Sequence, residues 1–208
     1  MRNLCHWEQT RGWPCLEEDL VTLYNNRSER GRQLAYDMPL PEYYGCMVLS
    51  RKLAEMERLT VLNRLSEIHP IDLYTASKSK NLDTMKGVIH PAVDYRTDMP
   101  KIFHLSHINL NITMPSIESG IPLRVWDIMS VGGFCLTSWQ EEIEEQFRIG
   151  REIEVYRNLE ELYEKTEYYL RNEDQRIRIA MGGYQAIRDR HNYQIRLKRM
   201  LEMAGNLA

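Results

Sequence analysis

The sequence predicts an α/β protein in which a parallel β-sheet lies between two layers of helices. Short apolar runs alternate with amphipathic segments of helical length, and five or six strands fit between residues 46 and 156. Strands joined by helices of ~10–15 residues pair in parallel, because each crossover brings the chain back to the same edge. The composition, 43% hydrophobic and 27% charged over 208 residues, is that of a globular chain and excludes disorder and collagen-like repeats.

The first 43 residues differ from the rest. Residues 17–36 are charged with few apolar positions, which indicates one or two surface helices, and Pro39 and Pro41 then stop any helix. We therefore expect a connector, or the remnant of an upstream domain, at 1–43 and one α/β domain at 44–208.

The first half of that domain is expected to alternate strand and helix. Apolar residues recur at every third position from Leu53 to Leu65, which predicts one buried helical stripe. Asp98 stands where a helix cap is expected, with Pro100 tolerated in the first turn. The expected elements are a strand at 46–49, a helix at 53–65, strands at 71–74 and 88–90, a helix at 99–105 and a strand at 108–112.

The second half is expected to be mostly helical. Asn158 and Glu161 form a capping pair that begins a helix. A glycine pair, Gly182-Gly183, is expected to weaken the helix that Asp174 begins. The expected elements are a helix at 122–131, a strand at 134–137, a short acidic helix near Glu141, a strand at 153–156 and helices from 158, 174 and 193.

Several functional classes are excluded by simple observations. The 27 basic and 30 acidic residues give a net charge of −3, which argues against a nucleic-acid binder. The four cysteines are far apart without a C-x-x-C pair, so we expect reduced structural thiols and no metal site. The N-terminus lacks the apolar region of a signal peptide, and no apolar run approaches the ~18 residues of a membrane-spanning helix. We therefore expect a cytoplasmic protein.

The segment 108–138 carries the chemistry. Its loop, 113–120, connects the carboxyl end of a strand to the N-terminus of a helix, where free N–H groups and the helix dipole favour an anion. Gly120 permits close backbone approach, and Ser116 and Ser119 supply hydroxyl donors. A diphosphate suits such a loop, although an ordinary helix cap has the same composition.

Asp127 lies in the helix that follows this loop. The neighbours Val125 and Ile128 belong to the apolar stripe, whereas Arg124 and Asp127 share the polar face. A carboxylate there can accept two hydrogen bonds from the cis-diol of a ribose. The alternative is a surface pair between Arg124 and Asp127, which contributes ~0.2–0.5 kcal/mol.

A run of motifs resembles a known family. The segment S-G-I-P-L-R-V-W-D-I-M-S-V-G-G-F-C-L-T-S (119–138) is similar to the C-terminal domain of family-1-type glycosyltransferases, and more narrowly to the spore maturation protein (CgeB-type) group. Two upstream segments, 57–75 and 93–113, fit the same group in order and spacing. The resemblance extends over roughly residues 43–200.

The resemblance implies a GT-B enzyme, in which two Rossmann-like domains face a cleft and the C-terminal one binds a nucleotide-diphosphate sugar without a metal or other cofactor. Asp127 then takes the place of the acid that holds the donor ribose, and Ser119 and Gly120 that of the diphosphate cradle. Arg51 and Lys52 are candidates for neutralising phosphate charge, the alternative being a solvated helix start. The turn 93–95, with Tyr95, is a candidate for bordering the nucleobase, the alternative being an ordinary turn. The expected donor-binding set is Arg51, Lys52, Tyr95, Ser116, Ser119, Gly120, Arg124 and Asp127.

The chain departs from the family pattern in two ways. Ser119 stands where many relatives carry a second acid that contacts the transferred sugar. An N-terminal domain that holds the acceptor (a glycan, lipid or protein) is expected as a partner, and no catalytic base is identified. The alternatives are an interaction module that has lost nucleotide-sugar binding and a nucleotide-sugar epimerase.

The C-terminal helices carry a net positive charge, although the whole chain is slightly negative. Residues 171–202 hold 8 basic and 4 acidic side chains. This excess fits solvated helix faces, packing on the N-terminal domain, or at most peripheral contact with an anionic membrane.

Overall fold

The computed structural model describes residues 49–76, 82, 85–114, 117 and 119–205. These residues fall into two compact units, of which the first holds 49–58, Met114 and Ile117, and the second holds the rest. The helices expected over 17–36, most of the strand expected at 46–49 and the connector expected at 1–43 lie outside the described residues.

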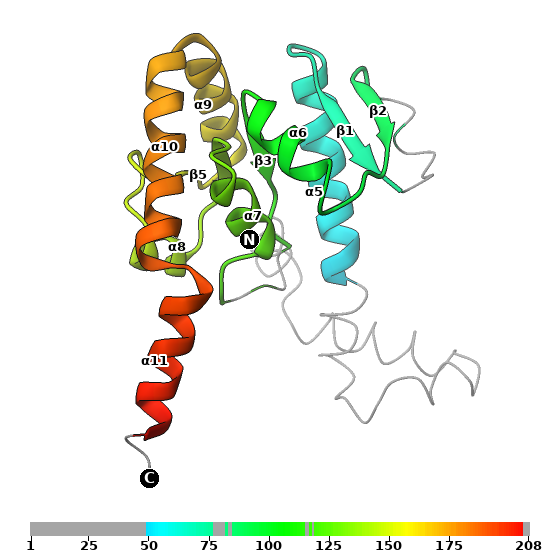
Figure 1. Cartoon of the computed structure of the whole chain (residues 1–208). Coiled ribbons are helices and arrows are strands. Elements are labelled where there is room, and N and C mark those ends of the chain that lie inside the picture. Colours follow the sequence, from blue (N-terminus) through cyan, green and yellow to red (C-terminus); the bar gives the residue numbers. More distant parts are fainter. Residues whose placement is uncertain (1–48, 77–81, 83–84, 115–116, 118, 206–208) are drawn as a thin grey trace, which may run out of the picture. The chain divides into compact units, whose positions relative to one another are not determined.

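Helices and short strands are interleaved from residue 50 to residue 171, except that the second strand follows the first, and the described chain ends in consecutive helices (Figure 1). The elements are α5 Ser50–Ser66, β1 Asp72–Thr75, β2 Val88–Pro91, α6 Met99–Leu105, β3 Asn109–Asn111, α7 Leu123–Ser130, β4 Cys135–Ser138, α8 Glu141–Gln146, β5 Glu154–Tyr156, α9 Leu159–Arg171, α10 Glu173–Arg190 and α11 Tyr193–Gly205. Each expected element after residue 50 is present, most with its ends moved by one to three residues.

All strand pairs in the described residues are parallel. β1 pairs with β2, and the larger sheet has the order β3-β4-β5. Asn109 lies opposite Cys135, and Leu136 lies opposite Glu154. The fold class, a Rossmann-like α/β arrangement, is confirmed, with the strands divided between two small sheets.

The larger sheet is covered by helices on both faces. Neighbouring side chains of a strand point to opposite sides, so β4 and β5 each contribute to two core clusters. Leu136 and Tyr156 join a core cluster with residues of α9, α10 and the second half of α5: Val61, Leu65, Leu162, Tyr169 and Ile179. Cys135 and Val155 join a second cluster with residues of α7 and α8: Val125, Ile128, Met129 and Ile143. Burial raises the pKa of the Cys135 thiol to about 12, as befits a structural cysteine.

The buried face of α5 is not the one that the spacing of three predicted. Met56, a member of that stripe, is 53% exposed, whereas Ala54, Val61 and Leu65 are buried. A helix has 3.6 residues per turn, so positions three apart drift steadily around its axis and cannot all face one core. The expected stripe is therefore wrong at Met56 and right at Leu65, with its other members half-buried.

The glycine pair in α10 does not interrupt the helix, which runs without a break from Glu173 to Arg190. Instead the pair lies against the backbone before β5. A Cβ atom on Gly182 would be 2.2 Å from the carbonyl oxygen of Arg151, and one on Gly183 would be 2.4 Å from that of Glu152. The expectation of a weakened helix is corrected, because these glycines allow α10 to approach the preceding turn closely.

Candidate functional site

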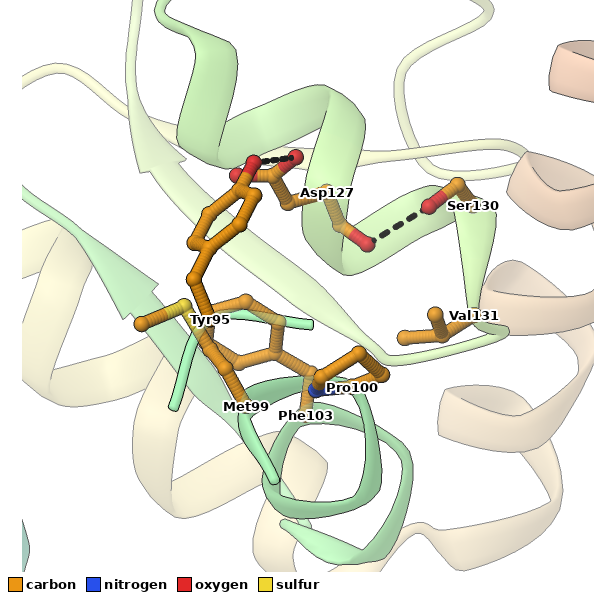
Figure 2. Close-up of a pocket in the computed structure, with 7 residues that line it drawn as sticks. All are labelled: Tyr95, Met99, Pro100, Phe103, Asp127, Ser130 and Val131. Atoms are coloured by element: carbon orange, nitrogen blue, oxygen red, sulfur yellow. Dashed lines mark hydrogen bonds between the residues drawn. The ribbon is translucent and has the colours of Figure 1, made fainter. Parts of the chain in front are cut away.

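Asp127 lines a surface pocket between α6 and α7 (Figure 2). Val125, Ile128 and Met129 hold the inner face of α7 in the core, so the helix turns Asp127 outward. The Tyr95 hydroxyl donates a hydrogen bond of 2.6 Å to Asp127 Oδ1. The residues that line the pocket are Tyr95, Met99, Pro100, Phe103, Asp127, Ser130 and Val131.

A tight turn after β2 positions Tyr95. Asp94 Oδ1 accepts hydrogen bonds from the backbone N–H groups of Arg96 (2.9 Å) and Thr97 (2.8 Å) and from the Thr97 hydroxyl (2.9 Å). The bonds from Thr97 and Arg96 hold the pKa of Asp94 below its usual value. The expected cap, Asp98, makes no capping bond and pairs with Lys101 instead. Asp94 organises this turn because its short side chain reaches the N–H groups two and three residues ahead.

Tyr95 presents an accessible ring at the pocket, with 56% of its surface exposed. Its pKa is raised, first by the hydrogen bond to Asp127 and then by burial and by the charge of that carboxylate. The phenol therefore stays protonated near neutral pH and remains a donor. Tyr95 thus offers a flat apolar ring surface at the pocket, while its hydroxyl donates to one oxygen of the Asp127 carboxylate.

Arg124 does not pair with Asp127, so the alternative of a simple surface pair between them is wrong. Its Nη1 donates to Met99 Sδ at 3.3 Å, and its guanidinium lies 5.5 Å from the centre of the Phe103 ring. Both partners line the pocket, so Arg124 places a positive charge beside it.

The loop before α7 is only partly described. Gly120 has φ +89, a conformation that favours glycine. Its N–H donates a hydrogen bond of 2.8 Å to Glu142 Oε1, from α8. Ser119 is exposed, and Ser116 lies outside the described residues. The amide that we expected to meet a phosphate is therefore bound to an internal carboxylate, and Glu142 is a residue that sequence reasoning missed.

The two remaining site candidates belong to the first unit. Arg51 is exposed at the start of α5, and Lys52 forms an ion pair with Glu55 at 2.9 Å. Their contact with phosphate stays a prediction. Among the expected donor-binding residues, the structure joins Tyr95 to Asp127 directly and places Arg124 beside the same pocket.

Comparison with known families matches this chain to one of them. The model of a family described as glycosyl transferase-like covers residues 48–202. The chain belongs to this glycosyl transferase-like family. The matched region contains the whole pocket, the Gly120 loop and α8, so the membership supports a role in glycosyl transfer. A comparison with curated proteins gave no match.

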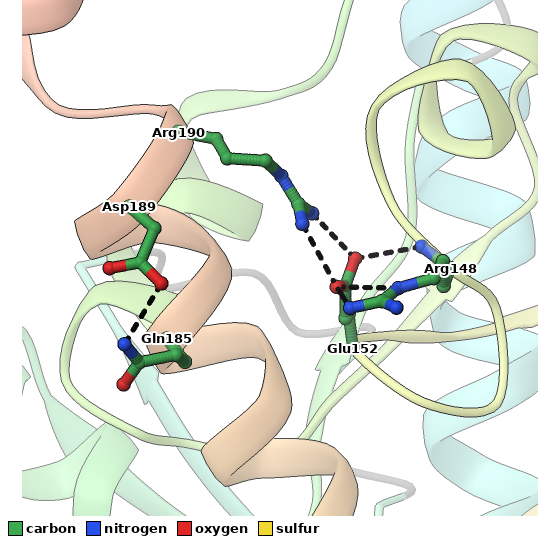
Figure 3. A network of polar contacts seen from close by, with 5 residues as sticks. All are labelled: Arg148, Glu152, Gln185, Asp189 and Arg190. Carbon is green, nitrogen blue, oxygen red and sulfur yellow. Dashed lines mark hydrogen bonds and ion pairs between the residues drawn. The ribbon is translucent and has the colours of Figure 1, made fainter.

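Among the described residues of the glycosyltransferase-like domain, Glu152, before β5, has a carboxyl pKa that is strongly lowered (Figure 3). It is 3% exposed and accepts hydrogen bonds from Arg190 Nη2 at 2.7 Å and Arg148 Nε at 2.8 Å. Burial opposes ionisation, but the bonds from Arg190 and Arg148 outweigh it and lower the pKa to about 2. Glu152 ties the turn before β5 to the end of α10, which is a structural role.

The variant Glu152→Gln is expected to lose about 1–3 kcal/mol of unfolding free energy at pH 7, because it loses charge-assisted hydrogen bonds to two partly exposed arginines. The carboxyl pKa falls from an ordinary 4.5 to about 2 on folding, so its contribution is complete above pH 4.5 and is lost as pH falls toward 2. Urea unfolding at pH 7 and pH 3 measures this. The difference in unfolding free energy between wild type and variant is expected to be smaller at pH 3 than at pH 7. An equal difference at both pH values would contradict the stabilising role of the ionised Glu152 carboxylate.

Two further features of the described residues concern membranes and metals. Every helix there is too short or too polar to cross a lipid bilayer. Within the same residues, His, Cys, Asp and Glu side chains do not gather in groups of three or more that suit a metal ion.

Proposed function

We propose that this domain binds the nucleoside diphosphate part of a nucleotide-sugar donor and that Asp127 holds the ribose. The observation that supports this most is the hydrogen bond of 2.6 Å from the Tyr95 hydroxyl to Asp127 at a surface pocket. A carboxylate that accepts an O–H bond there has the chemistry to accept the vicinal hydroxyls of a ribose in its place.

The other side chains of the proposed site divide the remaining tasks. The exposed Tyr95 ring offers a flat surface to a nucleobase. Arg124 and the loop with Ser119 and Gly120 stand toward the diphosphate, where positive charge and N–H groups would stabilise the departing phosphate. Contact of Arg51, Lys52 and Ser116 with the donor stays a prediction from the sequence.

The wider setting is also a proposal. The domain acts without a metal or other cofactor, as the C-terminal half of a GT-B enzyme of the CgeB-type group, in the cytoplasm. An N-terminal domain supplies the acceptor site, and the acceptor is a glycan, a lipid or a protein.

A thermal-shift screen tests this proposal. Uridine, guanosine and adenosine diphosphates and their sugars are each added at increasing concentration. A ligand at 100 times its Kd adds about 2.7 kcal/mol of stability, so one nucleoside diphosphate is expected to raise Tm by roughly 5–10 °C. The matching nucleoside monophosphate, which lacks the second phosphate, is expected to give a smaller shift. A flat response to the whole set would refute the proposal.

One observation favours a second function, a Rossmann-like interaction module without nucleotide binding. The Gly120 N–H is already bound by Glu142, as in a loop that no longer needs an anion. The same screen separates the two functions, because the module gives no shift with any nucleoside diphosphate.

A further inference from the structure

We propose that Glu142 is an internal anion that holds the Gly120 N–H until a diphosphate replaces it, and that Glu142 thereby lowers the affinity of the domain for diphosphates. This inference rests on the proposed function, because it concerns the same loop. Its test uses inorganic pyrophosphate, so that a failure of this inference can be distinguished from a failure of the proposed function.

The contact has the chemistry of a filled anion site. The Gly120 N–H donates to Glu142 Oε1 at 2.8 Å, across 22 positions of sequence. A hydrogen bond from a backbone N–H to an ionised oxygen is short and strong, and a phosphate oxygen uses the same donor in the same way. Glu142 and a diphosphate therefore compete for one N–H group.

The contact with Gly120 provides a hydrogen bond to only one of the two oxygens of the Glu142 carboxylate. Glu142 Oε2 is buried and has no hydrogen-bond partner in the described part of the chain. A buried acceptor that has lost water without gaining a donor destabilises the state that contains it. Release of Glu142 restores water to both oxygens, which favours its exchange for a ligand.

The residues that follow Gly120 have anchors other than Glu142. Ile121 packs against the core cluster around α7, and its carbonyl oxygen accepts a bond of 3.3 Å from Trp126 Nε1. Pro122, with its fixed φ, leads directly into α7. These anchors remain when Glu142 leaves. The hydrogen bond between Gly120 and Glu142 is therefore better explained as exchangeable than as a structural contact.

The experiment titrates inorganic pyrophosphate into the whole chain by calorimetry and follows the Gly120 N–H by ¹H–¹⁵N NMR. Glu142→Ala removes the competing acceptor, and Glu142→Gln keeps an acceptor oxygen but removes the charge. Glu145→Gln is the matched control, because Glu145 is an exposed carboxylate of the same helix. Circular dichroism and Tm establish that each variant is folded.

Pyrophosphate is expected to bind about tenfold more tightly to Glu142→Ala than to wild type, with Glu142→Gln between them. The control is expected to change affinity by less than about twofold, as general screening of an exposed charge allows. The Gly120 resonance is expected to move in Glu142→Ala and also when pyrophosphate is added to wild type. Binding to Glu142→Ala alone, with a silent wild type, supports the proposal as well.

Two outcomes overturn the proposal. One is equal or weaker pyrophosphate binding in both Glu142 variants while wild type binds, which leaves the proposed function intact. The other is no binding to any variant, which also removes the diphosphate contact from the proposed function. If the Glu142 variants bind pyrophosphate more tightly but no nucleoside adds affinity, the proposed function fails and the role of Glu142 stands.

Discussion

The variant Gly182→Ala is expected to lose roughly 3 kcal/mol or more of unfolding free energy. The added Cβ would stand 2.2 Å from the carbonyl oxygen of Arg151, which is a backbone atom and cannot rotate away. Either α10 or the turn before β5 must shift, and this turn also holds the Glu152 network. Helix propensity alone gives the opposite sign, because alanine in a helix interior is about 0.5–1 kcal/mol better than glycine.

Urea unfolding of three proteins measures this effect. Gly205→Ala is the matched control, because a Cβ atom there meets nothing within 4 Å. The control is expected to stay within about 0.5 kcal/mol of wild type. A gain in stability for Gly182→Ala would show that the close approach of α10 is wrong.

The variant Asp127→Ala is expected to weaken binding of the nucleoside diphosphate identified by the thermal-shift screen by about 100-fold. This corresponds to about 2.7 kcal/mol, as expected when charge-assisted hydrogen bonds to a ribose are lost. Asp127 faces outward from α7, so the same variant is expected to leave Tm without ligand nearly unchanged. Calorimetric titration of wild type and variant gives both affinities.

Two companion variants interpret the result. Asp98→Ala removes a carboxylate from the neighbouring start of α6, where it pairs with Lys101, and is expected to preserve affinity. Asp127→Asn keeps the shape of the side chain and is expected to retain part of the binding. An Asp127→Ala protein that binds as well as wild type would remove the ribose from this pocket.

The order and type of the elements could be predicted from the sequence because local signals agree. The predicted bounds of α6, Met99–Leu105, are the observed ones, with Pro100 in the first turn, although Asp98 makes no capping bond. Asn158 caps α9 as expected, since its side chain accepts the Glu161 N–H at 2.9 Å. The division into two sheets depends on long-range pairing, which no short pattern carries.

Within the candidate site, the residues that could be predicted from the sequence are those whose position depends on a single helix or strand. Asp127 could be placed because the apolar stripe of α7 leaves it outside. The contact between Tyr95 and Asp127 crosses 32 positions, and that between Gly120 and Glu142 crosses 22. Both depend on how neighbouring loops meet in three dimensions. Asp94 was available as a signal, because an aspartate after a strand often closes a turn on the next N–H groups.

Every residue that lines the pocket comes from one uninterrupted stretch, Tyr95–Val131. The stretch begins after β2 and ends just before the Gly132-Gly133 turn into β4. This stretch is therefore one cassette that carries the pocket-lining side chains, whereas Glu142, the partner of Gly120, lies outside it. Chimeras that exchange this cassette between family members would transplant the pocket intact, with both junctions outside strands and helices.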